Sequence, residues 1–349
     1  MTDAAQTPPR HSRRGLVVPF AIVGVLLAAW TGWWFWLADQ IETRLAVHEQ
    51  ALSEAGWRVS HQPVSVGGWP FRTRVAFPAA EIVAPSGHGV SAPELVAEAN
   101  AWNPGHWVVI APDGLTLSRA GKGRIDIGGD GARMSVSHLR DRFPDLRAEL
   151  IRPTFTPRPD AEPFPIASAE HVQFEMRPHL TDGVAATDEL DVLFRLIEAR
   201  GRPGGPVEGA ARSGRLSMEI EATIEQASRL RGVDSAGVFA NWTAADGRFT
   251  GVRGRLLAGE SSARISSDAL SARADGRLEG QLALTAERPG EAMAGLAGSR
   301  SGAVNRVAAA GAAAAASAQG DRPMELVLRF RDGRTWLGPF ALAPAPKLF

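Results

Sequence analysis

The chain has 349 residues, with 38 acidic and 38 basic side chains and no cysteine. The balanced charge argues against a nucleic-acid-binding protein, which usually carries a basic field, and the lack of cysteine excludes disulfide bonds and thiol chemistry. Hydrophobic residues make up 44% of the chain, which is enough to build a packed core.

The N-terminal part of the chain predicts a membrane anchor. A polar tail, residues 1–14, precedes an uncharged run from Leu16 to Leu37. A helix needs about 20 apolar residues to cross a bilayer, so we predict a transmembrane helix over residues 15–38. Arginines before the run and acidic residues after it place the tail in the cytoplasm and the rest of the chain on the far side of the membrane. The run ends in aromatic residues typical of an interfacial belt: Trp30, Trp33, Trp34, Phe35 and Trp36.

A cleaved signal peptide is the alternative for this run. Signal peptides have a shorter apolar region, roughly 7–15 residues, and small residues at the cleavage site. Here the apolar region continues into four tryptophans, and bulky Trp36 stands where a small residue is needed before Ala38. We therefore favour an uncleaved anchor.

A second helical pattern follows the anchor. Ile41, Leu45, His48 and Leu52 form one helical stripe, and Gly56 is a natural end for a helix. We predict a juxtamembrane helix over residues 39–56 that packs this stripe against the first sheet.

From Trp57 onward the period changes from 3.6 to 2, because short segments alternate apolar and polar residues between Pro, Gly, Asp and Asn. Recurrent Asp-Gly pairs are strong turn signals. We predict a first β half (57–152), a Pro-rich connector (153–165), a second β half (166–290), an Ala-rich helical segment (291–320), and a closing strand with an extended C-terminus (321–349). The predicted fold class is mainly β (α+β): an N-terminal transmembrane helix, then a large, mostly antiparallel β-sheet body with a few peripheral helices.

The sequence shows no catalytic motif: there is no G-x-S-x-G elbow, no phosphate-binding loop and no H-E-x-x-H. His171, Glu175 and His179 would line up as metal ligands on a helix, but their segment alternates like a strand, which spreads them over roughly 26 Å. We therefore expect no metal, no cofactor and no enzymatic activity. An enzyme would need a pocket that gathers distant residues, such as His106 and Asp113.

Two aromatic clusters are the candidate interaction surface. They are either turns pinned by aromatic packing or a rim that touches lipid or another protein. Their residues are Trp69, Phe71, Trp102, His106 and Trp107.

These clusters carry a family resemblance. The segments VSVGGWPFRTRVAF, SAPELVAEANAWNPGHWVVIAPDGLTL and LRFRDGRTWLGPFALAPAPKLF resemble a family of Gram-negative envelope proteins known only as domain of unknown function 2125. The resemblance implies a single inner-membrane anchor and a periplasmic β-rich body with no established activity. The architecture also resembles, more loosely, large anchored envelope proteins that form lipid-conducting β grooves.

These observations lead to an expected function. A long sheet with one apolar face must bury that face on itself, under a helix or against acyl chains. We therefore expect a non-enzymatic protein of envelope maintenance that holds lipid on an apolar β surface. The alternative is a structural protein that docks another envelope protein through the Trp102–Trp107 loop or the closing strand; an enzyme of unknown type comes third.

Overall fold

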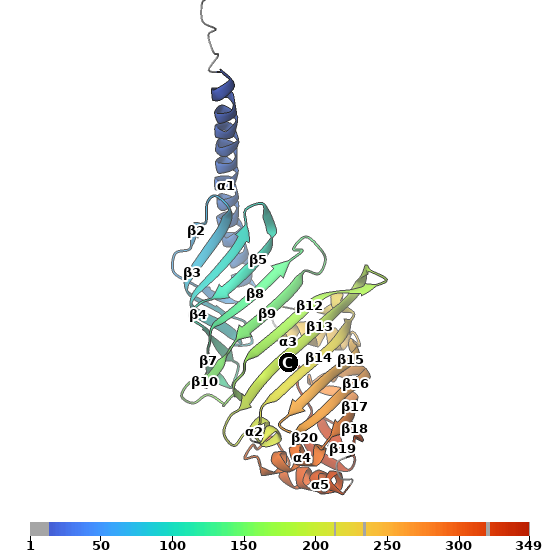
Figure 1. Ribbon diagram of the computed structural model, residues 1–349. Helices are drawn as coiled ribbons and strands as arrows, with labels where there is room; N and C mark the ends of the chain where they lie inside the picture. The colour runs from blue at the N-terminus through green and yellow to red at the C-terminus, as the bar shows by residue number, and fades with distance from the viewer. Residues whose placement is uncertain (1–13, 213, 233–234, 319–321, 349) are drawn as a thin grey trace, which may run out of the picture.

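The computed structural model describes residues 14–212, 214–232, 235–318 and 322–348, so the predicted tail lies almost wholly outside it. Most of the body is antiparallel β-sheet, which confirms the predicted fold class (Figure 1). One long apolar helix precedes the sheet, and short helices accompany its C-terminal half.

Helix α1 runs without interruption over Arg14–Glu54. The predicted transmembrane and juxtamembrane helices are therefore one continuous helix, since no helix-breaking residue stands between them. Within the described chain, α1 is the one helix that is long and apolar enough to cross a membrane. In the later part, Ile41, Leu45 and Leu52 are half-buried as predicted, whereas His48 is exposed and its neighbour Glu49 is half-buried instead.

Twenty strands follow in the described part of the chain, all joined in one sheet. The first ten are β1 (Arg58–Ser60), β2 (Ser65–Gly67), β3 (Arg72–Val83), β4 (Gly89–Asn100), β5 (Asn103–Ala111), β6 (Leu115–Arg119), β7 (Gly123–Gly128), β8 (Gly131–Ser137), β9 (Asp145–Ile151) and β10 (Thr154–Pro157). The others are β11 (Ile166–Ser168), β12 (His171–Thr181), β13 (Val184–Gly201), β14 (Leu216–Glu225), β15 (Arg248–Ala258), β16 (Ser261–Ala272), β17 (Leu278–Glu287), β18 (Met324–Arg331), β19 (Arg334–Leu337) and β20 (Phe340–Pro344).

The remaining helices are short. They are α2 (Pro206–Ala211), the 3₁₀ turn η1 (Ala227–Arg229), α3 (Ser235–Ala244), α4 (Pro289–Gly298) and α5 (Arg306–Ser317). Helices α4 and α5 lie in the Ala-rich segment, as the sequence predicts. With α2, they gather at the end of the sheet that is remote from α1 (Figure 1).

The sheet divides after β4 and rejoins at β13. One branch continues from β4 through β5, β8, β9 and β12 to β13, and the other through β6, β7, β10 and β11 to β13. The two branches form a sandwich filled by side chains such as Ile125 and Phe155. Beyond β13 the sheet continues as a single meander from β14 to β20. The two β halves are thus one continuous sheet.

Three Asp-Gly pairs form hairpin turns between paired strands, at 182–183, 275–276 and 332–333, whereas those at 113–114 and 130–131 join strands that do not pair with each other and the one at 246–247 follows α3. Asp182 and Gly183 join β12 to β13 with φ angles of 52° and 81°, and Asp332 and Gly333 join β18 to β19 with 55° and 71°. Two successive positive φ angles are the geometry that suits a tight hairpin between twisted strands.

Candidate functional site

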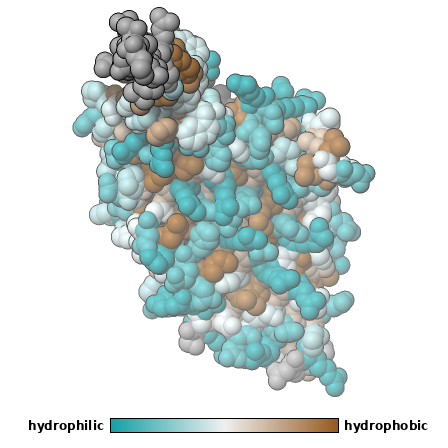
Figure 2. All heavy atoms as spheres, turned by 45° about the horizontal axis from the view of Figure 1, so that its top comes forward, coloured by the Kyte–Doolittle hydropathy of each residue, from teal (hydrophilic) through white to brown (hydrophobic). Residues whose placement is uncertain are grey.

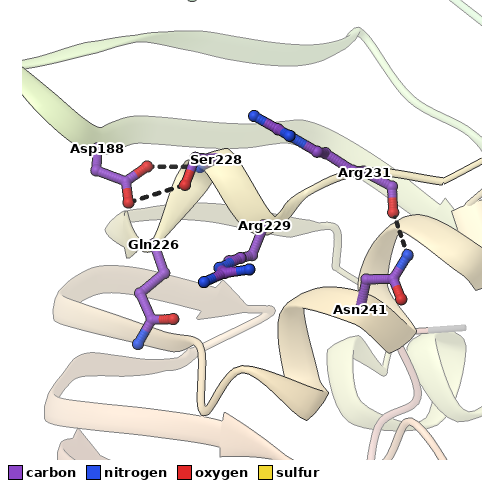
Figure 3. A pocket seen from close by; sticks show the side chains of 6 residues that line it. All are labelled: Asp188, Gln226, Ser228, Arg229, Arg231 and Asn241. Carbon is purple, nitrogen blue, oxygen red and sulfur yellow. Dashed lines mark hydrogen bonds between the residues drawn. The ribbon is translucent and has the colours of Figure 1, made fainter.

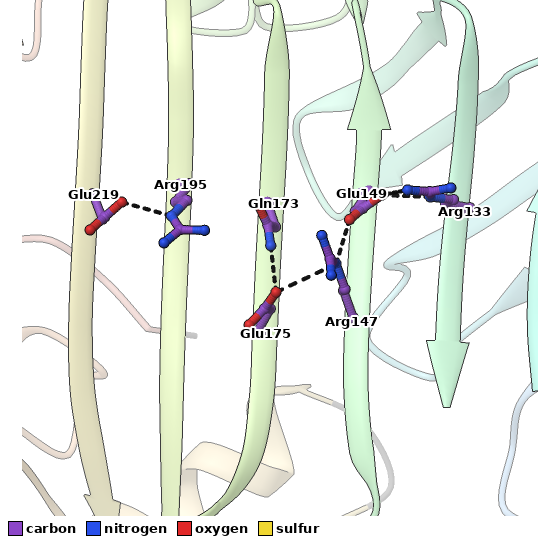
Figure 4. Close-up of polar contacts among 7 residues, drawn as sticks. All are labelled: Arg133, Arg147, Glu149, Gln173, Glu175, Arg195 and Glu219. Atoms are coloured by element: carbon purple, nitrogen blue, oxygen red, sulfur yellow. Dashed lines mark hydrogen bonds and ion pairs between the residues drawn. The ribbon is translucent and has the colours of Figure 1, made fainter. Parts of the chain in front are cut away.

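The long sheet has one charged face. A row of directly paired residues crosses nine strands from β8 to β18 on this face, and we call it the charged row: Arg133, Glu149, Gln173, Arg195, Glu219, Arg255, Arg264, Thr285 and Glu325. Figure 4 shows part of it, including the 2.7 Å hydrogen bond that Arg195 donates to Glu219. The surface seen in Figure 2 is largely hydrophilic, with hydrophobic residues in small separate patches.

Glu149 is the most buried carboxylate of the charged row, with only 3% of its surface exposed. Both Arg133 and Arg147 pair with it. Burial alone would raise the pKa of Glu149, but the hydrogen bond and charge of Arg133, together with Arg147, outweigh burial and lower that pKa. The charged side chains that line the cavity beside them, about 200 Å³ in volume, therefore pair with one another.

The opposite face of the same strands is apolar. Directly paired residues cross ten strands from β5 to β18 without one polar side chain, and we call this row the apolar strip: Val109, Met134, Ala148, Phe174, Phe194, Ile220, Gly254, Ile265, Leu284 and Leu326. Alternation alone produces this separation, because residues on neighbouring positions of a strand point to opposite faces.

Two layers cover the sheet on either side of the apolar strip. On one side, strands β7, β10 and β11 pack Ile125, Phe155 and Ile166 against apolar residues that lie beside the strip on the same face of the sheet. On the other side of the strip, η1 and α3 pack Ala227 and Trp242 against further apolar residues of the same face. Helices α4 and α5 cover the strip at its β18 end.

Between these layers the apolar strip is open in part. Met134 is 37% exposed and Phe174 is 38% exposed, although both lie on the apolar face. Phe194, Ile220 and Leu284 are half-buried. The four cavities that we describe are all lined by charged side chains, so the open strip, rather than an enclosed cavity, is the apolar surface that a ligand could occupy.

The predicted aromatic clusters meet at α1. Trp30 Nε1 donates a 2.8 Å hydrogen bond to the Pro70 carbonyl, and Trp34 Nε1 donates a 2.9 Å bond to the Arg72 carbonyl. Trp34 is buried by this contact, with 5% of its surface exposed. The β4–β5 turn joins the same group, because the Ala101 amide donates to the Phe71 carbonyl.

Six aromatic rings remain exposed around this junction, and we call them the aromatic collar: Trp33, Phe35, Trp36, Trp69, Phe71 and Trp102. Three come from α1 and three from two β turns more than thirty residues apart in the sequence. The structure thus brings together Trp69, Phe71 and Trp102 of the predicted interaction surface. His106 and Trp107 lie instead along strand β5, where His106 is exposed and Trp107 donates to the Pro104 carbonyl.

The arrangement of titratable residues does not gather a catalytic centre from the positions considered in the sequence. His106 lies within β5, about 16 Å at strand spacing from the end of that strand, and Asp113 lies in the turn that follows. His171, Glu175 and His179 lie along strand β12, as predicted. Within the described ranges no group of three or more His, Asp or Glu residues is placed to hold a metal ion.

Several residues of the open surface escaped sequence reasoning. Phe174 and Met134 look like ordinary core positions in an alternating strand, and only their incomplete covering distinguishes them. The cavity beside η1, lined in part by Arg229 and Arg231, also had no sequence signal, because isolated arginines are scattered throughout this chain.

The C-terminal part of α1 is tied to the body by His61. Its Nε2 lies 2.8 Å from Glu49 Oε1, and its Nδ1 lies 2.7 Å from the Gln62 carbonyl oxygen. The Gln62 hydrogen bond raises the pKa of His61, burial lowers it, and Glu49 raises it, so that the pKa lies above the ordinary 6.5. A protonated imidazole donates from both nitrogens, which matches this pair of acceptors.

We expect this contact to weaken as pH rises. Because the folded-state pKa of His61 exceeds its unfolded value, the stabilisation is fully present below the unfolded pKa and is lost as pH rises through the folded pKa. Glu49→Gln should therefore lower the thermal midpoint relative to the unmodified protein at about pH 6, and much less at about pH 8.5. Equal differences at the two pH values, measured by circular dichroism, would contradict this role.

The fold and these surfaces define a class of protein: a two-faced antiparallel sheet behind one apolar helix long enough to cross a membrane. The chain belongs to the family described as "Uncharacterized protein conserved in bacteria (DUF2125)", whose model matches residues 34–346. This is the family that the sequence resembles. No curated protein and no solved structure matches the chain.

Proposed function

We propose that this protein is a non-enzymatic lipid-binding protein of the bacterial envelope, anchored in the inner membrane by α1 with its body in the periplasm. The observation that carries the proposal is the apolar strip, in which Phe174 and Met134 stay more than a third exposed between two covering layers. Burying apolar surface is favourable by roughly 25 cal/mol per Å². Acyl chains suit such a strip because they bring no backbone groups that need hydrogen-bond partners.

The docking of α1 supports an anchor that is retained. Cleavage near residue 38 would remove Trp30, Trp34 and the buried side chain of Leu37, all of which contact or cover the body. A segment that is discarded after export has no reason to form hydrogen bonds with the mature domain. The uncleaved anchor therefore remains the better interpretation of this helix.

The aromatic collar supports a body held at the membrane surface. The apolar residues of α1 precede the collar in the sequence, so rings at residues 33–36 fall where such a helix would leave the bilayer. The Trp30 and Trp34 hydrogen bonds hold the turn of Trp69 and Phe71 against α1, and the bond from the Ala101 amide to the Phe71 carbonyl joins the turn of Trp102 to it. Tryptophan rings favour the interface between lipid and water, and in this position they would bring the body against the outer leaflet.

The proposal predicts that lipid stays with the purified full-length protein and depends on the strip. Phe174→Asp places a charge on the apolar strip, and we expect it to lower the lipid per protein, measured by mass spectrometry after mild detergent extraction, by about tenfold. Leu257→Asp is the matched control, because Leu257 is 53% exposed on the opposite, charged face. Absence of lipid from the unmodified protein, or its persistence in Phe174→Asp but loss in Leu257→Asp, would refute the assignment.

Docking of another envelope protein is the competing function, and crosslinking separates it from lipid binding. A photoreactive residue at position 174 should yield lipid adducts in intact cells. A discrete protein adduct at that position, without lipid adducts, would favour the docking function instead.

A further inference from the structure

The largest cavity we describe lies beside the covering layer formed by η1 and α3. It has a volume of about 480 Å³ and is lined by polar side chains: Asp188, Gln226, Ser228, Arg229, Arg231 and Asn241 (Figure 3). Strand β13 supplies the aspartate, α3 supplies Asn241, and η1 with its flanking residues supplies the rest. Three separate elements therefore converge on one polar space.

The cavity carries unpaired positive charge. Among the described residues that line the cavity, Asp188 is the one carboxylate, and it accepts hydrogen bonds from the Ser228 amide at 2.6 Å and the Ser228 hydroxyl at 3.0 Å, so its two oxygens are already engaged. The guanidinium groups of Arg229 and Arg231 form no ion pair or side-chain hydrogen bond with any described residue. In the charged row, Arg133 and Arg195 have carboxylate partners, whereas Arg255 and Arg264 form no ion pair with a described residue. Within the described lining, two guanidiniums without a carboxylate partner outnumber one engaged carboxylate, which favours an anionic ligand.

The segment 226–231, which supplies most of the cavity lining, is apolar on the side away from the cavity. Ala227 is buried and Leu230 packs in the cluster that includes Trp242 and Val192. Val192 is two positions before Phe194 on β13, so its side chain lies next to the apolar strip on the same face. The short segment 226–231 thus separates a cationic cavity from the apolar face of the sheet. Such a boundary matches a molecule with an anionic head and apolar chains.

We propose that this cavity binds the phosphate group of a lipid through Arg229 and Arg231, while its acyl chains lie along the apolar strip. The inference rests on the proposed lipid-binding function and adds the class of ligand. Arginine suits this task because its planar group can donate two hydrogen bonds to one phosphate. Asp188 then has a positioning role, since it holds η1 through Ser228.

The test compares three soluble probes on the full-length protein in a neutral detergent, using native mass spectrometry and calorimetry. The probes are dioctanoyl glycerol 3-phosphate, dioctanoylglycerol with the same chains and no phosphate, and glycerol 3-phosphate with no chains. The double variant Arg229→Gln/Arg231→Gln removes the proposed contacts. The control Arg264→Gln/Arg329→Gln removes two arginines that also form no ion pair with described residues but lie on strands β16 and β18.

We expect the unmodified protein to bind the phosphate-bearing lipid at least about tenfold more tightly than dioctanoylglycerol. The Arg229/Arg231 variant should lose this preference and keep dioctanoylglycerol binding, whereas the control should keep both. Equal binding of the two lipids by the unmodified protein, or a preference that survives in the Arg229/Arg231 variant, overturns the headgroup site and leaves lipid binding intact. Arginine-dependent binding of glycerol 3-phosphate without binding of either lipid assigns the cavity to free phosphate esters and refutes the lipid function. Failure of all three probes overturns both proposals.

Discussion

Trp242→Ala is expected to lower the free energy of unfolding by about 3–5 kcal/mol. The Trp242 side chain is fully buried under α3, and its Nε1 donates a 2.7 Å hydrogen bond to the Glu225 carbonyl. Its ring packs against Phe249 at a centroid distance of 4.9 Å and edge-on against Phe239 at 6.2 Å. Truncation leaves a cavity and an unpaired buried carbonyl, and both effects are destabilising.

The control for this variant is Trp102→Ala. Trp102 is 61% exposed in the aromatic collar, so its loss should change the unfolding free energy by about 0.5 kcal/mol or less. Urea unfolding followed by circular dichroism compares the two variants without relying on tryptophan emission. Similar midpoints for Trp242→Ala and the unmodified protein would show that α3 is not a tight cover for the sheet.

The second large effect concerns the contact between α2 and α4. A Cβ atom built on Gly295 would lie 1.8 Å from the Gly209 carbonyl oxygen, which is far inside any allowed contact. Gly295→Ala must therefore push the two helices apart. We expect it to destabilise the protein by about 1–3 kcal/mol or more, as overpacked substitutions do.

The matched control lies three residues further along the same helix. A Cβ atom on Gly298 would meet nothing within 4 Å. Alanine is favoured over glycine in helices by up to about 1 kcal/mol, so Gly298→Ala should be neutral or slightly stabilising. We expect the thermal midpoint to fall in Gly295→Ala and to stay unchanged or rise slightly in Gly298→Ala. A neutral Gly295→Ala would mean that α2 and α4 are not in close contact in solution.

Much of the fold could be predicted from local patterns. In strand β13 the alternation places Val192, Phe194 and Leu196 on one face and Asp191 and Arg195 on the other, and the register confirms this separation. Asp-Gly pairs mark turns, because a turn is a property of a few neighbouring residues, but only some of these turns join strands that pair with each other. The predicted boundary near residue 38 does not interrupt α1, because the change there is one of polarity and not of helix propensity.

The candidate site was less predictable because it depends on contacts between distant segments. Trp69 and Trp102 stood out by composition, yet nothing local indicates that their turns meet at Trp30 and Trp34 of α1. Phe174 is distinguished from a core residue only by its incomplete cover, since neither the layer of β7, β10 and β11 nor α3 buries it. His106 and Asp113 do not form a pair, because His106 lies within β5 and Asp113 lies in the turn beyond the end of that strand.

The sequence by itself determined an apolar helix near the N-terminus, a body of alternating strands and the absence of cysteine chemistry. These properties follow from side-chain polarity, backbone preference and short-range spacing, which act within a few residues. Only the tertiary structure decided that the sheet closes between β4 and β13, that the apolar strip remains open, and that Arg229 and Arg231 form no ion pair with another described residue. Each of these depends on which distant residues come to lie side by side, because burial and ion pairing are set by neighbours in space.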